Sequence, residues 1–309
     1  MSEEPSMPDS FPHNFKQILI IRHSIFKKIR SFFDKTGYVE VDTPCRVKCP
    51  GIDPYIDAIS AGEGFYLAPS PELQMKRLLT LGIPRIYQIT HAFRANEHGA
   101  LHNSEFSLLE WYRADTNYWG IMEETEELLR YLLHADAERY AYKLTVHTPV
   151  TRVRVDELFM SKAGWEPSKV WDEDRFFRDW VDKIDPYLST IPCVFMYDFP
   201  AALASLAKIK EDNCLVSERF ELFIHGIEIA NAFTELTDPM EQEERFKQSH
   251  KKRCALKKEP YKVDEKFLDD LRRGIPSCSG IALGIDRLIM ALYGFTEISM
   301  VQTFPETRL

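Results

Sequence analysis

Apolar residues recur with helical spacing near both ends of the chain. The first helical face carries four apolar residues that stand three or four positions apart, Ile21, Ile25, Ile29 and Phe32. Gly37 fits a helix C-cap, and residues 38–44 read as a strand that ends at a proline. A second helical stripe at residues 288–293 follows a glycine-containing apolar run at residues 277–284. The pattern therefore predicts a helix beside a strand at each end of the chain.

Strand-like patterns occupy much of the middle of the chain. Residues 85–93 and 105–112 flank a polar, glycine-containing connection, which predicts an antiparallel hairpin. Residues 219–232 are mostly apolar and read as strand, and residues 193–197 read as a buried strand that residues 198–200 end. Helical patterns at residues 123–140 and 172–184 lie among several prolines. This predicts short elements, with a surface insertion on the core sheet at about residues 145–192.

Polar side chains interrupt one face of the predicted hairpin. Alternation places Glu110 and Tyr112 on the same face as Phe106 and Leu108. A carboxylate and a phenol on an apolar face are costly to bury without a partner. Glu110 and Tyr112 therefore predict a cationic ligand.

Three carboxylates, Glu221, Glu228 and Glu235, recur every seven residues in the next apolar region. On a helix they would form a solvated stripe. Their mostly apolar neighbours favour a strand instead, and buried carboxylates need cations. This segment therefore also predicts a site for positively charged groups.

Two further segments fit the walls of a ligand cleft. Arg287 stands at the start of the last apolar helix, behind Gly280 and Gly284, which allow a ligand to approach the backbone closely. Ser70 and Pro71 fit the beginning of a helix, with Glu72 near its positive end. The segment around Arg287 suits a nucleotide.

The chain resembles the class II aminoacyl-tRNA synthetases, with motif 1 at about residues 11–45, motif 2 at about 90–114 and motif 3 at about 277–293. The stretches HNSEFSLLEWYRA, GIEIANAFTEL and SPELQMKRLL resemble the lysyl branch. EWYR and CSGIALGIDRL are most similar to its truncated paralogues, the elongation factor P (R)-β-lysine ligase family known as EpmA, PoxA or GenX. The resemblance implies an α+β fold, an antiparallel sheet flanked by helices, in one catalytic domain over residues 1–309.

The resemblance also implies an activity and a set of site residues. The activity would be ATP-dependent activation of (R)-β-lysine or lysine as an adenylate and its ligation to a lysine side chain of elongation factor P. Arg94 and Arg287 would be catalytic, and Glu221 and Glu228 would hold Mg²⁺. The substrate would contact Ser70, Pro71, Glu72, Glu110, Tyr112, Asn231, Glu235 and Ala282. ATP would contact Arg94, Ala95, Asn96, Glu97, His102, Asn103, Phe106, Glu228, Ile229, Gly284 and Arg287.

Some positions depart from the family pattern. Motif 2 usually reads Arg-x-Glu, whereas this chain has Arg94-Ala95-Asn96-Glu97, so either Asn96 substitutes for the glutamate or Glu97 shifts into its place. Ala282 stands where full-length lysyl enzymes carry glycine, and its methyl group would disfavour α-lysine against β-lysine.

The net charge of the chain and the position of motif 1 indicate whether tRNA is a partner. The chain has 48 acidic and 39 basic residues, a net charge of −9 and a pI near 5.6, whereas tRNA binding usually leaves a basic footprint. Motif 1 begins almost at once, so we expect no anticodon-binding domain and no tRNA. The basic run at residues 251–258 reads as a solvated helix face.

The sequence further predicts a cytoplasmic homodimer. No signal-like or membrane-spanning apolar stretch is present, and six scattered cysteines favour reduced thiols. The class implies a two-fold dimer, with Phe26 and Phe33 as exposed apolar residues of the motif 1 helix.

Other functions stay open at this point. The chain could be a lysine-adenylating paralogue with another acceptor, or a non-catalytic regulatory sensor of lysine and ATP. It could also be an ammonia ligase that makes asparagine from aspartate, although such an enzyme would want cationic groups around the substrate side chain.

Overall fold

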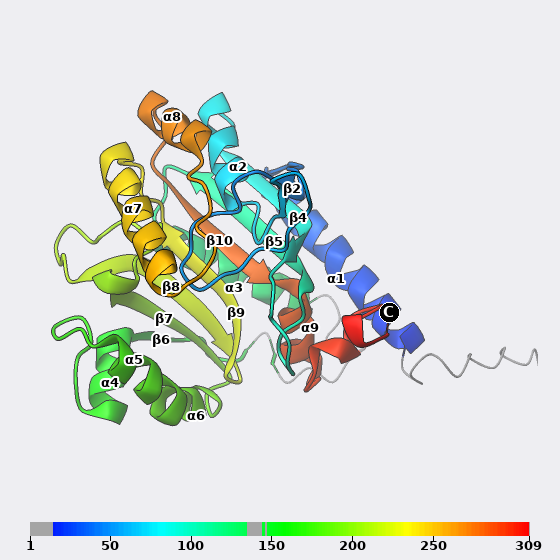
Figure 1. Cartoon of the computed structure of the whole chain (residues 1–309). Coiled ribbons are helices and arrows are strands. Elements are labelled where there is room, and N and C mark those ends of the chain that lie inside the picture. Colours follow the sequence, from blue (N-terminus) through cyan, green and yellow to red (C-terminus); the bar gives the residue numbers. More distant parts are fainter. Residues whose placement is uncertain (1–14, 135–143, 146, 309) are drawn as a thin grey trace, which may run out of the picture.

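The computed structural model describes residues 15–134, 144–145 and 147–308. Its centre is an eight-stranded sheet in the order β1-β4-β5-β10-β9-β8-β7-β6 (Figure 1). In that order the strands are Val39–Glu40, Arg85–Phe93, Glu105–Ala114, Cys278–Gly284, Ile227–Thr234, Val216–Ile224, Cys193–Pro200 and Thr151–Arg154. The six central strands are antiparallel, and only the outer strands β1 and β6 run parallel to their neighbours. The predicted α+β class is confirmed.

One face of the sheet packs against α1 (Phe15–Lys35), α3 (Tyr118–His134) and α9 (Ile285–Tyr293). The predicted apolar stripe of α1 is buried in this core. Gly37 ends α1 as predicted: its φ is +78°, and the N–H of Tyr38 donates to the carbonyl of Phe33 over 3.0 Å, as in a Schellman motif. The exposed position predicted for Phe33 is wrong, because its ring is buried and stacks on Tyr87 with centroids 4.5 Å apart.

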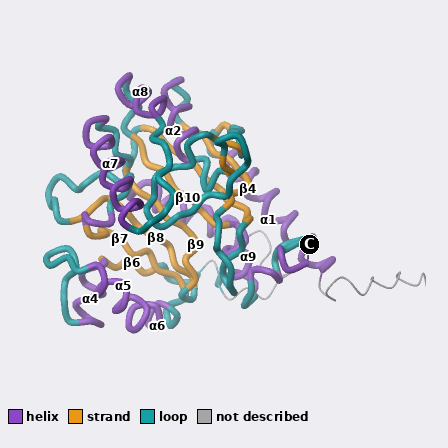
Figure 2. The backbone as a smooth tube through the Cα atoms, in the orientation of Figure 1, coloured by secondary structure: helices purple, strands orange, loops and turns teal. Residues whose placement is uncertain are grey.

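Two groups of helices cover the ends of the opposite face. The first group is α2 (Glu72–Leu78), α7 (Pro239–Ala255) and α8 (Glu265–Arg273), and the second is α4 (Val155–Ala163), α5 (Glu173–Asp179) and α6 (Asp185–Leu188). Helices thus surround a single layer of strands (Figure 2). Short helical turns and a small sheet complete the fold, at Leu79–Leu81, Trp180–Ile184, Ala201–Leu203, Ile298–Met300, Glu306–Arg308, β2 (Arg46–Val47) and β3 (Tyr66–Leu67).

Several element boundaries differ from those that the sequence predicts. The predicted strand at residues 219–232 is a hairpin, because His225 and Gly226 take positive φ angles of 48° and 79° and form a tight turn between β8 and β9. Strand β7 continues past Tyr197 to Pro200 through an irregularity at Asp198. Helix α3 begins before residue 123 because Asn117 Oδ1 accepts the backbone N–H of Trp119 over 3.1 Å.

Two more of the predicted elements are altered, and part of a third lies outside the described residues. The strand predicted at residues 38–44 is only two residues long, and the helix predicted at residues 172–184 ends at Asp179 and continues as a π-turn. The end of the predicted helix at residues 135–140 lies outside the described residues. None of the helices in the described ranges has the length and hydrophobicity to cross a membrane.

Candidate active site

Two adjoining cavities open on the sheet face between the two groups of helices. The smaller has a volume of about 200 Å³ and the larger about 830 Å³. Both are lined by Arg94, Arg219, Asn231 and Ala282. A ligand in one cavity would therefore lie directly beside a ligand in the other.

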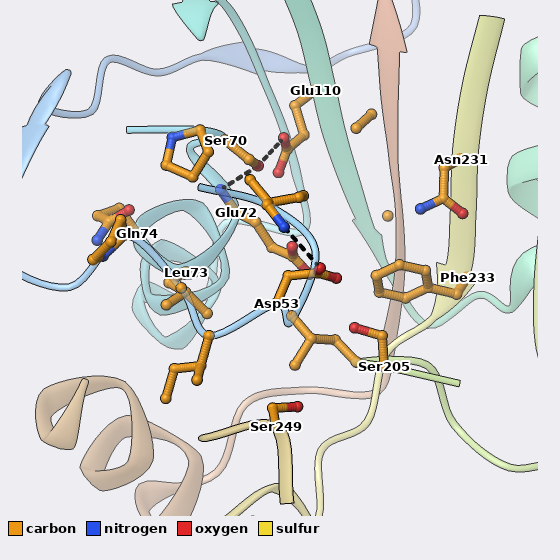
Figure 3. Close-up of a pocket in the computed structure, with 18 of the residues that line it drawn as sticks. Asp53, Ser70, Glu72, Leu73, Gln74, Glu110, Ser205, Asn231, Phe233 and Ser249 are labelled. Atoms are coloured by element: carbon orange, nitrogen blue, oxygen red, sulfur yellow. Dashed lines mark hydrogen bonds between the residues drawn. The ribbon is translucent and has the colours of Figure 1, made fainter. Parts of the chain in front are cut away.

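Glu110 forms the acidic floor of the smaller cavity. It shares one face of β5 with Tyr112, and only 1% of Glu110 is exposed. Its Oε2 accepts a hydrogen bond from Ser70 Oγ over 2.8 Å (Figure 3). Its Oε1 accepts one from Tyr112 Oη over 2.6 Å. Burial, with the nearby charge of Glu72, raises the pKa of Glu110 to about 7. A ligand with a positive charge would restore the carboxylate form.

Glu235 supplies a second buried carboxylate just after β9. Lys76 Nζ lies 2.5 Å from its Oε2 in an ion pair, and its Oε1 has no hydrogen-bond partner among the described residues. Lys76 also lies 2.6 Å from Glu72 Oε1. Burial lowers the pKa of Lys76, but the two carboxylates outweigh it and raise the pKa overall. Lys76 was not among the site residues predicted from the sequence.

The two glycines of β10 have different surroundings in the structure. A Cβ atom at Gly280 would overlap the ring of Tyr112 and stand 2.7 Å from Glu235 Oε1, so Gly280 makes room for the protein's own side chains. A Cβ atom at Gly284 would meet the protein's own atoms only at ordinary contact distances of 3.8 Å or more, and Gly284 lines the larger cavity.

Asn231 faces the junction of the two cavities from β9. Its Oδ1 accepts a hydrogen bond from Arg219 Nε over 2.9 Å, and the arginine can only donate. The amide NH₂ is therefore the group that Asn231 can offer to a ligand. It suits a carboxylate.

The larger cavity contains the two predicted catalytic arginines. Arg287 donates to the carbonyl of Leu101 over 3.1 Å, and one of its terminal nitrogens lies 2.6 Å from His102 Nε2. Burial and the charge of Arg287 lower the pKa of His102, so the imidazole accepts this hydrogen bond in its neutral form. Arg94 has a buried Nε with no hydrogen-bond partner in the described part of the chain. Two such cations suit a polyanionic ligand.

Glu221 and Glu228 lie on the neighbouring strands β8 and β9 and face the larger cavity. Burial raises the pKa of Glu221 to about 7; Arg219, 2.6 Å away, opposes the rise and Glu228 adds to it. Two hard oxygen donors that repel each other fit a divalent cation such as Mg²⁺. No group of three or more His, Cys, Asp or Glu residues that could hold a metal occurs among the described residues, so phosphate oxygens or water would have to complete the coordination.

Arg253 positions the loop that borders both cavities. Its guanidinium is fully buried and donates to the carbonyls of Asp53 (2.6 Å) and Ile56 (2.8 Å) and to Asp57 Oδ1 (2.8 Å). The prediction of a solvated helix face at residues 251–258 is therefore wrong at this position. Asp53 and Ile56 line both cavities.

Most of the predicted site residues meet in the two cavities. Those that line one or both are Ser70, Glu72, Arg94, Glu97, His102, Asn103, Phe106, Glu110, Tyr112, Glu221, Glu228, Ile229, Asn231, Glu235, Ala282, Gly284 and Arg287. Three are not in either lining, Pro71, Ala95 and Asn96. Asn96 takes a positive φ of 62°, which Asn tolerates better than most residues, and Glu97 instead faces the larger cavity.

Several residues of the site were not predicted from the sequence. Arg219 precedes Glu221 by two positions and so shares its strand face, which alternation alone could have indicated. The region at about residues 145–192 is more than a surface insertion, because it supplies the edge strand β6 and part of the cleft wall. Its contributions to the larger cavity are Phe176, Phe177, Trp180 and Asp185.

Comparison with known proteins agrees with this geometry. The family model "tRNA synthetases class II (D, K and N)" matches residues 8–308, so the chain belongs to this family of class II synthetases. Among individual relatives, proteins named elongation factor P--(R)-beta-lysine ligase match it over 94% of its length and 95% of theirs. The identity is 39% for the protein of Baumannia cicadellinicola, 37% for that of Hamiltonella defensa and 35% for that of Salmonella arizonae.

Proposed function

We propose that this protein uses ATP to activate (R)-β-lysine or lysine as an aminoacyl-adenylate and transfers the acyl group to a lysine side chain of elongation factor P. One observation carries the proposal: an acidic cavity of amino-acid size opens, at Arg94, into a larger cavity that contains a second arginine. The names of the relatives support the same substrate and acceptor.

Recognition of the substrate follows from the charges of the smaller cavity. Its ammonium groups would bind to Glu110, Glu235 and Glu72, each hydrogen bond to a charged group contributing about 1.5–3 kcal/mol. Its carboxylate would bind to Arg94 and to the NH₂ of Asn231 at the junction. This orientation points the carboxylate at the larger cavity.

The activation step needs positioning and charge stabilisation more than proton transfer. A carboxylate oxygen, already ionised at neutral pH, forms a bond to the α-phosphorus of ATP, and the bond from that phosphorus to the bridging oxygen breaks to release pyrophosphate. Arg94 would stabilise the charge at the reacting phosphate and Arg287 the charge on the γ-phosphate. Bound at Glu221 and Glu228, Mg²⁺ would neutralise part of the phosphate charge.

The transfer step completes the reaction. The amine of the acceptor lysine, in its neutral form, bonds to the carbonyl carbon of the adenylate. The bond to the phosphate oxygen then breaks, AMP leaves, and the amine loses its extra proton to water.

We further propose that the protein is a cytoplasmic homodimer whose acceptor is a protein and not tRNA. Each chain would form one catalytic domain, in which residues 145–192 are an insertion. The net charge of −9 supports a partner other than tRNA. Leu19 and Ile20 on α1, 41% and 48% exposed, support the dimer in place of the predicted Phe33.

Mass spectrometry of the acceptor tests the proposal. Incubation with ATP, elongation factor P and each lysine isomer should add one lysyl or β-lysyl mass to a single lysine of the acceptor. Release of pyrophosphate without modification of the acceptor would support lysine adenylation with another acceptor. If neither isomer supports exchange of pyrophosphate into ATP, the proposed function is wrong.

A further inference from the structure

Gln242 on α7 is a fully buried polar residue that lines the smaller cavity. Neither the oxygen nor the nitrogen of its side-chain amide has a hydrogen-bond partner within residues 15–134, 144–145 and 147–308. Most buried polar groups in proteins are hydrogen-bonded, and one that has no partner lowers stability. The position of this amide in the lining suggests that its partner is a ligand of the cavity.

The first turn of α7 holds Gln242 at a fixed position. The Asp238 side chain caps the helix by accepting the backbone N–H groups of Met240 over 2.8 Å and of Glu241 over 3.1 Å, and Pro239 suits the first helical position. The backbone N–H of Gln242 donates to the carbonyl of Asp238 over 3.0 Å. A capped helix therefore presents the amide to the cavity.

The residues that line each cavity show which end of the smaller cavity Gln242 occupies. Along α7, Gln242 lines only the smaller cavity, Arg245 lines both, and Lys252 lines only the larger. Strand β9 and the residue that follows it show the same order, because Asn231 lines both cavities and Glu235 lines only the smaller. Gln242 and Glu235 therefore lie toward the end of the smaller cavity that is remote from the nucleotide.

We propose that Gln242 is a further substrate-binding residue, whose amide oxygen accepts a hydrogen bond from the side-chain ammonium group of the amino acid. The inference rests on the proposed function, which points the substrate carboxylate at the larger cavity and so directs the side-chain ammonium to the remote end. An ammonium group has three N–H donors. The amide oxygen supplies one acceptor without a further negative charge beside Glu72, Glu110 and Glu235.

Pyrophosphate exchange by the whole protein tests this contact. Gln242→Met removes both polar atoms of the amide and keeps a linear side chain of similar size. We expect its KM for lysine and for (R)-β-lysine to rise by about ten- to a hundredfold, the scale for a lost hydrogen bond to a charged group. The kcat should stay within a few-fold of wild type, because this contact is remote from the reacting atoms and is present before and during the reaction.

The stability of the ligand-free protein gives a second, opposite readout. Gln242→Met removes a buried amide that has no partner, so we expect the unfolding temperature to rise by about 2 °C or more. Gln88→Met is the matched control: Gln88 on β4 is 2% exposed, lines neither cavity, and accepts a hydrogen bond from Thr43 Oγ1 over 2.9 Å. This control should lower the unfolding temperature, because it breaks an existing hydrogen bond.

Gln242→Glu separates the hydrogen bond from packing. The variant keeps an acceptor oxygen at the same distance from the helix, so its KM for lysine should stay below that of Gln242→Met. A KM as high as that of Gln242→Met would contradict the role of the oxygen as an acceptor.

The remaining outcomes also decide the inference. A folded Gln242→Met protein with the wild-type KM for both isomers overturns it. If that variant does not fold, Gln242→Asn takes its place, since the amide is withdrawn by one methylene, and a wild-type KM there has the same meaning. Wild-type protein that catalyses no exchange with either isomer contradicts the proposed function itself, and this inference with it.

Discussion

The side chain of Ala282 places a single methyl group at the centre of the proposed substrate site. It pairs with Glu110 of β5 on one side and with Asn231 of β9 on the other, and it lines both cavities. We expect Ala282→Gly to raise kcat/KM for α-lysine more than for (R)-β-lysine. One misplaced methyl group changes discrimination by about ten- to two-hundredfold.

Ala232→Gly is the matched control for that change. Ala232 is fully buried on the other face of β9, in the core beneath α1 and α3. Loss of its methyl group should lower the free energy of unfolding without changing the ratio of kcat/KM between α-lysine and (R)-β-lysine. An unchanged ratio in Ala282→Gly as well would mean that Ala282 does not select the isomer.

The raised pKa of Glu110 predicts how lysine binding depends on pH. Burial raises its pKa from 4.5 to about 7, so the free protein holds it protonated below pH 7 and lysine must displace that proton. Lysine affinity should therefore rise between pH 6 and pH 8, by up to about tenfold per pH unit below 7. The same shift makes Glu110 lower the stability of the free protein as pH rises from about 4.5 to 7.

Calorimetric titration with lysine alone, at several pH values, measures the affinity. Glu110→Gln should weaken binding and remove the pH dependence that belongs to Glu110. A wild-type affinity that is constant from pH 6 to pH 8 would contradict the raised pKa.

Arg287 should matter for the reaction and little for the fold. Its side chain lies in the larger cavity and binds to Leu101 and His102. We expect Arg287→Ala to reduce pyrophosphate exchange by about 10²–10³-fold or more, the scale for a lost charge-stabilising donor. Arg272→Ala on α8, where the arginine pairs with Asp269 and Glu243, is the control. Exchange within a few-fold of wild type in a folded Arg287→Ala protein would refute the motif 3 assignment.

At the scale of single residues, the charged residues of the site were easier to predict from the sequence than the contacts between them. Glu110, Glu235 and Arg287 were identifiable because charged residues on apolar segments need partners. The partners themselves come from distant segments: Lys76 reaches Glu235 from another element, so no local pattern reveals that contact. The direction of the Asn231 amide likewise depends on Arg219, on a neighbouring strand.

The turn between β8 and β9 connects the two strands that carry the proposed Mg²⁺ ligands. Gly226 has a φ of +79°, and a Cβ atom there would overlap Ser189, whose Cα would be only 3.0 Å away. We expect Gly226→Ala to lower the free energy of unfolding by about 1–3 kcal/mol, measured by urea denaturation.

Gly62→Ala separates the two causes of that loss. Gly62 has a similar φ of +74° but open space around the Cβ position, so this variant reports the backbone strain alone. If both variants lose the same stability, the contact with Ser189 has no cost.

Elements with an unbroken local pattern were predicted closely. The hairpin strands β4 and β5 lie where alternation placed them, because a polar connection separates two clear apolar runs. The turn at residues 225–226 was missed because apolar residues continue on both sides of it. The π-turn after α5 has no sequence signal of its own.

At the scale of the molecule, the fold class was predictable and the cleft was not. Residues 145–192 read as a surface insertion, because their prolines and short helices give no indication of what they cover. In the structure, Phe176 and Trp180 form a wall of the larger cavity. That placement depends on how the insertion packs on β7 and β8.

Light scattering tests the proposed homodimer. The chain mass is 36.0 kDa, and we expect twice that mass at micromolar concentration. Replacement of Leu19 and Ile20 by Glu should yield monomers, because it places charges on the exposed apolar strip of α1. Leu81→Glu, at a 70% exposed site elsewhere, should remain dimeric. A wild-type monomer would contradict the proposal.

Arg219 makes each cavity sensitive to what fills the other. It donates to Asn231, which lines both cavities, and pairs with Glu221, which lines the larger one, so a ligand that moves one partner changes the free energy of the other. If ATP and lysine bind as proposed, thermodynamic linkage requires that each alters the affinity of the other by the same factor. The order in which the two substrates arrive therefore cannot change the stability of the complex that they form together.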